Sequence, residues 1–240
     1  HSGSIVGLGC LVCYLFDIYI PISNLLNNRL KSYNPKCNSI IVPPICDFEQ
    51  FDQIPTTKTI EDDYFLFCGS SGYEDVIHFV IDAYLKSKSQ DAVLLYLVIN
   101  GKISEKLNSI IVKTDGRIRL FSNLDYESLI AMYKQSLGLL IPLRNNLQDN
   151  ARFPQKICEY IASGRLIITT NQGEIEKYFS DKLNAIVAGS YDNQAYADCL
   201  DWLLENKKEL SELLIESYKT GKKYFDVKSY EAVFERILAP

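Results

Sequence analysis

The sequence predicts an α/β fold in which a doubly wound parallel sheet follows the remnant of a preceding α/β domain. From residue 64 onward, short apolar runs alternate with amphipathic stretches, and the runs lack polar alternation, which is typical of parallel strands covered on both faces. The 240 residues are 47% hydrophobic and 23% charged, the proportions of an ordinary globular protein. Disorder and a membrane bundle are therefore excluded.

The strands and helices of this sheet domain can be placed in order. Helical spacing of apolar residues is clearest over 73–84 and 126–133, and weaker over 104–113. Residues 153–164 have a proline near the start and a glycine at the end, as helices favour. A short helix is expected near 174–179, and the chain beyond 190 is helical. The expected strands are 64–69, 92–101, 117–121, 137–143, 165–170 and 184–189.

The domain boundaries follow from changes in composition. Residues 1–46 are expected to be the incomplete end of the preceding domain, with strands at 17–23 and 39–45 and a helix at 23–33. Residues 47–62 lack an apolar period and predict a linker. The sheet domain then spans 63–225. Residues 226–240 predict a final helix that crosses back to the first part, because its apolar stripe needs a partner surface.

The N-terminal segment and the cysteines bear on location. The apolar run 5–16 ends at Asp17, short of membrane length, and fits a buried segment or an interfacial anchor; we favour burial. Seven cysteines without a repeating spacing favour a reducing cytoplasm, and Cys10-x-x-Cys13 lacks further zinc ligands nearby. We expect a cytoplasmic protein without a metal, with peripheral association at the inner membrane face as the alternative.

Several function classes are excluded by charge and by missing residues. The net charge of −5 gives no basic footprint for nucleic acid. The chain has two histidines, of which His78 lies on the polar face of its predicted helix, so a Ser-His-Asp or Cys-His mechanism is not expected. No Walker lysine motif is present.

Candidate binding residues follow the carboxyl ends of the predicted strands, where open α/β sheets bind ligands. The turn after the first strand is a Gly-rich entry to a helix where amides can meet a phosphate, although a tight turn alone also explains its glycines. The second and third strands end in polar residues. The candidates are Gly69, Ser70, Ser71, Gly72, Asn100, Gly101, Ser122 and Asn123.

The segment 144–164 is richer in candidates. Arg144 and Arg152 flank the polar run LQDN, which we expect to be a loop. Lys156 lies in the first turn of the predicted helix, where a cation opposes the helix dipole, so it indicates either an anionic ligand or a solvated lysine. Glu159 lies between apolar neighbours, where its carboxylate can accept hydrogen bonds from a vicinal diol such as ribose. The alternative is a salt bridge to Arg144 or Arg165.

Residues 152–179, RFPQKICEYIASGRLIITTNQGEIEKYF, resemble the nucleotide-sugar glycosyltransferases of the GT-B architecture, which has two Rossmann-like domains, particularly the retaining family 4. The order of elements from 17 to 238 also fits. The resemblance covers nearly the whole chain, but it corresponds to the C-terminal, donor-binding domain and the last unit of the N-terminal, acceptor-binding domain. By this resemblance, we expect most of the acceptor domain to lie outside the sequence.

The resemblance implies roles for single residues. Glu159 is the second glutamate of the family's E-x7-E motif and holds the donor ribose, whereas the first falls at Ala151. The family's Arg and Lys after the first strand have no counterpart in 70–75. The diphosphate would therefore be held by Arg144, Arg152, Lys156 and amides near Phe153. The base would rest near 100–101 and 121–123, mainly against backbone.

For function, the resemblance implies a retaining, hexosyltransferase-type enzyme that moves a sugar from a nucleoside diphosphate sugar to a carbohydrate or lipid-linked acceptor. Residues 153–160 read F-P-x-K-x-x-E-Y, and members of the family with this pattern occur in polysaccharide assembly, so the resemblance implies a role in cell-surface polysaccharide assembly. The sugar nucleotide is a substrate, no cofactor is expected, and this fragment alone would be inactive. Two alternatives remain, a degenerate non-catalytic module for nucleotide binding or assembly, and a nucleotide-sugar epimerase. The missing first glutamate and basic pair favour the degenerate module, and the intact helix favours the enzyme.

Overall fold

The computed structural model describes residues 14–55 and 62–238, and its centre is a six-stranded sheet. Every pair of neighbouring strands is parallel, and the strand order is β3-β2-β1-β4-β5-β6. This confirms the doubly wound parallel sheet. The strands are β1 (Tyr64–Ser70), β2 (Leu94–Asn100), β3 (Ile118–Phe121), β4 (Gly138–Ile141), β5 (Ile167–Thr170) and β6 (Ile186–Ala188).

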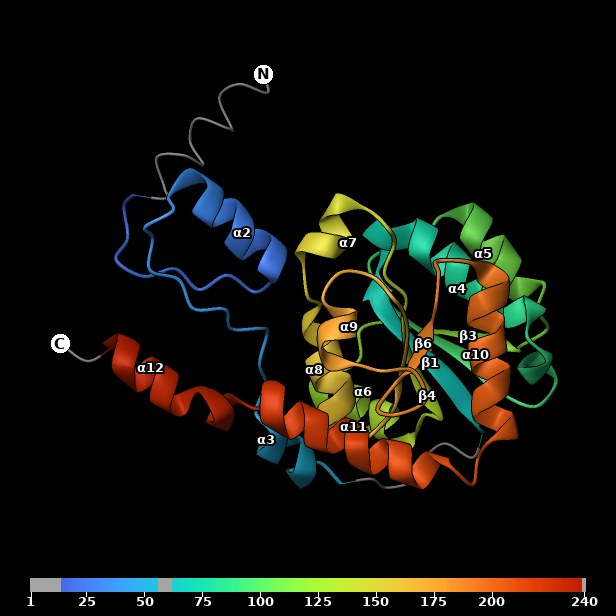
Figure 1. Cartoon of the computed structure of the whole chain (residues 1–240). Helices are drawn as coiled ribbons and strands as arrows, with labels where there is room; N and C mark the ends of the chain where they lie inside the picture. The colour runs from blue at the N-terminus through green and yellow to red at the C-terminus, as the bar shows by residue number, and fades with distance from the viewer. Residues whose placement is uncertain (1–13, 56–61, 239–240) are drawn as a thin grey trace, which may run out of the picture.

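Helices cover both faces of the sheet, which explains why the strands read as continuous apolar runs (Figure 1). All residues of β4 and β5 are buried. One face packs on α4 (Glu74–Lys86), α5 (Glu105–Val112) and α10 (Asn193–Glu205). The other packs on α6 (Tyr126–Gln135), α8 (Gln155–Ala162) and α9 (Ile175–Tyr178), with α11 (Leu210–Tyr224) packed against α8. Short 3₁₀ turns are η1 (Ser71–Tyr73), η2 (Lys88–Asp91) and η3 (Val227–Tyr230).

The expected linker contains a helix, α3 (Phe48–Gln53). Phe48 and Phe51 are at most 1% exposed and join the core on the α8 face. Gly221 of α11 permits this packing, since a Cβ there would lie 2.8 Å from the Phe48 ring and 2.4 Å from Ile161. The helix was not predicted, because two aromatic anchors are too few to produce a helical period in sequence.

The N-terminal part contains the expected helix, α2 (Asn24–Tyr33), but not the expected strands. Segments 17–23 and 39–45 form one parallel bridge, Tyr19 to Ser39, and are otherwise irregular. Pro21 has no N–H to extend a ladder, and Pro43 and Pro44 end the second segment. The strands at 17–23 and 39–45 are thus corrected to a single bridge, and neither segment enters the six-stranded sheet.

The C-terminal segment meets the N-terminal part at Cys46. The Cys46 amide donates to the Phe225 carbonyl at 2.9 Å, and the Val227 amide donates to the Cys46 carbonyl at 3.0 Å. Beyond this point α12 (Glu231–Leu238) extends away from the sheet, and none of its residues is buried (Figure 1). Across the described part of the chain, no helix combines the length and apolar character needed to cross a membrane. The run 5–16 and the Cys10–Cys13 pair lie outside the described residues.

Candidate functional site

The strand order creates a crevice between β1 and β4. Connections from these neighbouring strands lead to opposite sides of the sheet, and open α/β sheets bind ligands at such a switch point, beyond the carboxyl ends of the strands. A pocket of about 270 Å³ lies there, between the ends of β1 and β4 and the start of α8. We call it the switch-point pocket. Its polar lining includes Ser70, Tyr73, Arg152, Gln155 and Lys156.

A second pocket, of about 350 Å³, adjoins the first. We call it the β2 pocket because it lies between the ends of β1 and β2 and the segment after β3. Its walls combine the amides Asn100 and Asn123 with the apolar side chains of Val98, Leu124 and Leu129. The two pockets share Lys156 and the 68–70 segment. The two pockets therefore meet at Lys156, and Arg152 adds a second cation on the side of the switch-point pocket.

The structure brings together about half of the residues predicted for the site. Gly69, Ser70, Asn100, Asn123, Arg152 and Lys156 line one or both pockets. Ser71, Gly72, Gly101 and Ser122 line neither. Arg144, Phe153 and Glu159 also line neither pocket, and Glu159 lies one helical turn beyond Lys156 on α8. Gly101 has a local structural role, because its φ is +100° and a Cβ there would lie 2.4 Å from the Ser71 Oγ.

The Phe153 side chain lies in the core rather than in a pocket. It is 2% exposed, and its ring stacks on Phe225 at a centroid distance of 5.2 Å and meets Tyr178 edge-on. This packing anchors the chain immediately before α8. Phe153 thus positions the helix start, and only its backbone is near the predicted phosphate region.

Glu159 is a half-buried carboxylate without a protein partner. Among the described residues, no hydrogen bond or ion pair reaches it. Burial raises the pKa of Glu159, and the nearby Lys156 ammonium partly offsets that rise. The salt-bridge alternative is wrong because Arg144 pairs with Asp149 and Asp75, and Arg165 donates to the Lys134 carbonyl.

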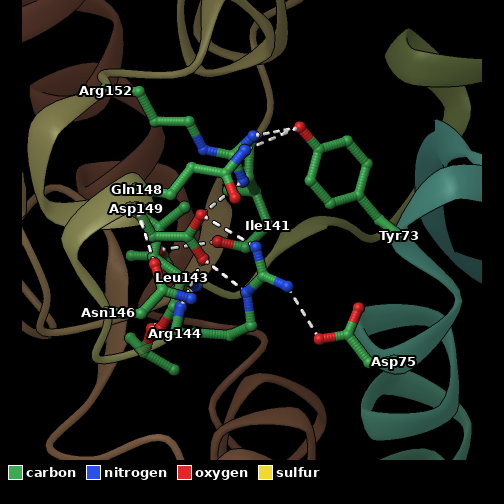
Figure 2. Close-up of polar contacts among 11 residues, drawn as sticks. Tyr73, Asp75, Ile141, Leu143, Arg144, Asn146, Gln148, Asp149 and Arg152 are labelled. Atoms are coloured by element: carbon green, nitrogen blue, oxygen red, sulfur yellow. Dashed lines mark hydrogen bonds and ion pairs between the residues drawn. The ribbon is translucent and has the colours of Figure 1, made fainter. Parts of the chain in front are cut away.

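A buried carboxylate, missed in the sequence, organises the two arginines (Figure 2). The run LQDN is not a loop but the core of α7 (Leu147–Ala151), which is capped by Asn146. Asp149 on this helix is fully buried. It accepts from the Arg144 Nε at 2.8 Å and pairs with the Arg152 Nη2 at 2.8 Å. Burial raises the pKa of Asp149, but the hydrogen bonds from Arg144 and the charge of Arg152 hold it below its ordinary value.

Tyr73 is the second residue missed in the sequence. Figure 2 shows its hydroxyl pointing toward Arg152 and Gln148, and the centre of its ring lies 4.9 Å from the Arg152 Cζ and 5.6 Å from the Arg144 Cζ. The helical spacing of 73–84 suggested only a core position for it. We call Tyr73, Arg144, Asp149 and Arg152 the arginine cluster. The only sign of this cluster in the sequence is that Arg144 lies five residues before Asp149 and Arg152 three residues after it. In the part of the chain that the structure describes, no group of three or more His, Cys, Asp or Glu could hold a metal ion.

The sequence matches the family described as Glycosyl transferases group 1 over residues 49–220. The chain belongs to this family. The match covers the whole sheet and both pockets, and it agrees with the GT-B resemblance. No curated protein matches the sequence.

Several solved structures share the fold of this chain. Sucrose-phosphate synthase from Thermosynechococcus elongatus superposes with a TM-score of 0.78 at 12% identity, covering 98% of this chain and 61% of that one. HepE from Anabaena, in complex with UDP-glucose, gives 0.74 at 12% identity, with 95% and 65% covered. A glycosyltransferase from Rickettsia africae gives 0.70 at 16% identity, with 92% and 63% covered. The chain thus spans less than two thirds of the length of these proteins.

Proposed function

We propose that this chain is the donor-binding part of a glycosyltransferase that uses a nucleoside diphosphate sugar. The observation that carries the proposal is Glu159, an unpartnered, half-buried carboxylate one helical turn from the cation shared by both pockets. A carboxylate in this state can accept two hydrogen bonds from the ribose diol. Glu159 and Lys156 lie three residues apart on the same helix, so a diol and an anion could be bound side by side.

The two pockets correspond to the two chemical halves of a nucleotide. The β2 pocket offers apolar side chains and amides, which suit a base. The switch-point pocket offers Lys156, Arg152 and the start of α8, which suit a diphosphate because helix N-termini and cations stabilise phosphate. HepE, which shares the fold, has been solved with UDP and with UDP-glucose.

The three predicted cations do not contribute equally. The Arg144 guanidinium donates from Nε and Nη2 to Asp149 and from Nη1 to Asp75, so each of its three nitrogens already has a carboxylate partner. Lys156 forms no ion pair among the described residues and lines both pockets. We therefore assign the diphosphate to Lys156 and Arg152, with Arg144 holding the cluster together.

The finer assignment is a retaining hexosyltransferase that acts without a metal or other cofactor on a carbohydrate or lipid-linked acceptor in polysaccharide assembly. The acceptor would be bound largely by parts of the protein outside this chain. A peripheral location at the inner face of the membrane fits such an acceptor. Sugar transfer by the whole protein, measured with a labelled donor, tests this assignment.

A binding-only module is the second candidate, and Ala151 favours it. At the position of the family's first glutamate, the chain presents a methyl group, and the Ala151 carbonyl accepts a hydrogen bond from the Ser23 Oγ at 2.6 Å. Such a module would bind the nucleotide through Glu159 but transfer no sugar. Nucleotide binding without donor turnover by the whole protein would favour this candidate over the enzyme.

We expect Glu159→Gln to weaken nucleoside diphosphate binding. The amide keeps the shape but replaces one acceptor oxygen by a donor, and leaving a ribose hydroxyl unpaired costs about 1–3 kcal/mol, or roughly 5- to 150-fold in affinity. Titration calorimetry with UDP and GDP measures the loss. Glu212→Gln, an exposed change on α11, is the matched control and should leave affinity unchanged.

The same variant should stabilise the unliganded protein at neutral pH. Burial raises the native pKa of Glu159 above its unfolded value, so the ionised form is disfavoured in the fold, and that penalty is present above the native pKa. The Tm of Glu159→Gln should exceed that of the wild type at pH 7, and the difference should shrink as pH falls through the raised pKa. A sharply lower Tm with unchanged nucleotide affinity would show that Glu159 is structural.

A further inference from the structure

We infer that Tyr73 is a positioning residue for the phosphate half of the donor site, acting by holding Arg152 at the wall of the switch-point pocket. The inference rests on the proposed function. It starts from the placement of Tyr73 in η1, between β1 and α4, with its side chain across the crevice from α7. Tyr73 and Arg152 both line the pocket.

Tyr73 contacts Arg152 in two ways. The Arg152 Nη1 donates to the Tyr73 hydroxyl at 2.9 Å, and the Arg152 Cζ lies 4.9 Å from the centre of the Tyr73 ring. Gln148 also reaches the hydroxyl, at 3.5 Å, and the Arg144 Cζ lies 5.6 Å from the ring. The hydrogen bond to the Tyr73 hydroxyl therefore orients the Arg152 guanidinium, and the contact with the ring sets its position against the pocket wall.

The two arginines differ in how far carboxylates neutralise their charge, and Arg152 is the less neutralised of the two. Arg144 has two carboxylate partners, Asp149 and Asp75. Arg152 shares Asp149 with Arg144, and among the described residues its other terminal nitrogen donates only to the uncharged Tyr73 hydroxyl. A neutral acceptor holds a guanidinium in place without cancelling its charge. Arg152 thus presents an oriented, incompletely compensated cation to the pocket that it lines.

Orientation in advance matters because arginine has a long and flexible side chain. A guanidinium already fixed by Tyr73 and Asp149 loses little further conformational freedom when a phosphate arrives. Tyr73 is partly buried and packs at the edge of the core, so its hydroxyl and part of its ring remain available to Arg152. The segment 70–75 contains no lysine or arginine. Through Tyr73, this segment contributes to phosphate binding by holding Arg152, which lies on the other side of the crevice.

The test compares Tyr73→Phe and Tyr73→Leu for binding of UDP and uridine, and of GDP and guanosine, by titration calorimetry. Tyr73→Phe loses the hydroxyl and keeps the ring, so diphosphate affinity should fall about 2- to 10-fold. Tyr73→Leu loses both contacts and should weaken it further. Nucleoside affinity should stay within about twofold of wild type, since a nucleoside has no phosphate. Tyr230→Phe removes a hydroxyl that donates to the Tyr224 carbonyl away from the pockets, and is the matched control.

A double-mutant cycle with Arg152→Ala separates positioning from simple structural loss. Once Arg152 is absent, Tyr73→Leu should cause no additional loss of diphosphate affinity. Additive losses, equal losses for nucleoside and diphosphate, or unchanged diphosphate affinity in Tyr73→Leu would each overturn the role of Tyr73 while leaving the donor site intact. If the wild-type chain binds none of the four ligands, the proposed function fails and the role of Tyr73 falls with it.

Discussion

Replacing Asp149 by alanine is expected to lower the free energy of unfolding by about 3–5 kcal/mol, because it removes the buried carboxylate of an ion-pair network and leaves Arg152 without a carboxylate partner and Arg144 with Asp75 alone. Asp149 is fully buried and contacts both arginines. It also accepts from the Arg144 backbone amide at 2.8 Å. The substitution therefore leaves two guanidinium groups and one amide without their shared acceptor. Urea denaturation followed by circular dichroism measures the loss.

Asp82→Ala is the matched control for this loss. Asp82 is an exposed residue on α4, and its replacement should change stability by no more than about 0.5 kcal/mol. The pH dependence provides a second check. The native pKa of Asp149 is lowered, so its contribution is present above the unfolded pKa and is lost as pH falls through the native value. An Asp149→Ala protein as stable as Asp82→Ala would mean that the cluster in Figure 2 does not hold α7 in place.

Lys156→Ala is expected to reduce nucleoside diphosphate affinity by roughly 10- to 100-fold. Charge-assisted contacts to phosphate are worth about 1.5–3 kcal/mol each, and every 1.4 kcal/mol is a factor of ten. Lys156 lines both pockets and has no ion-pair partner among the described residues, so its charge is available to a ligand. Titration with UDP or GDP against the matching nucleoside measures the phosphate-dependent part.

The control for Lys156 is Lys113→Ala. Lys113 is exposed at the end of α5 and lines neither pocket. Its replacement should leave both affinities unchanged. A Lys156→Ala variant that binds UDP and GDP as the wild type does would exclude the start of α8 as the phosphate site. Losses of equal size for nucleoside and diphosphate would show that Lys156 supports the pocket without contacting phosphate.

The sheet could be predicted from sequence because each of its strands is covered on both faces. A strand such as β4, with every residue buried, appears as an unbroken apolar run whatever its neighbours are. The bridge at Tyr19 could not be anticipated in the same way. The apolar residues of 17–23 and 39–45 resemble strands, and it is the prolines that limit them to a single pairing.

The site was only partly predictable, for a physical reason. Lys156 and Glu159 lie on one helix, so their spacing in the sequence already places them together. The partners of Arg144 and Arg152 depend instead on how α7 packs against the β1–α4 turn. Tyr73 is 79 residues from Arg152 along the chain, and no local sequence pattern could predict that contact. Helical periodicity marked Tyr73 as apolar, although its hydroxyl carries the interaction that matters here.

The structure of this chain in complex with UDP or GDP tests the donor site most directly. We expect the ribose hydroxyl oxygens within about 3 Å of the Glu159 carboxylate, at ordinary hydrogen-bond distance. The base should occupy the β2 pocket, and the diphosphate should contact Lys156 and Arg152 in the switch-point pocket. A nucleotide bound elsewhere, such as in the pocket of about 350 Å³ lined by Leu25, Asn150 and Gln172, would contradict the assignment. So would a nucleotide in these pockets whose ribose makes no contact with Glu159.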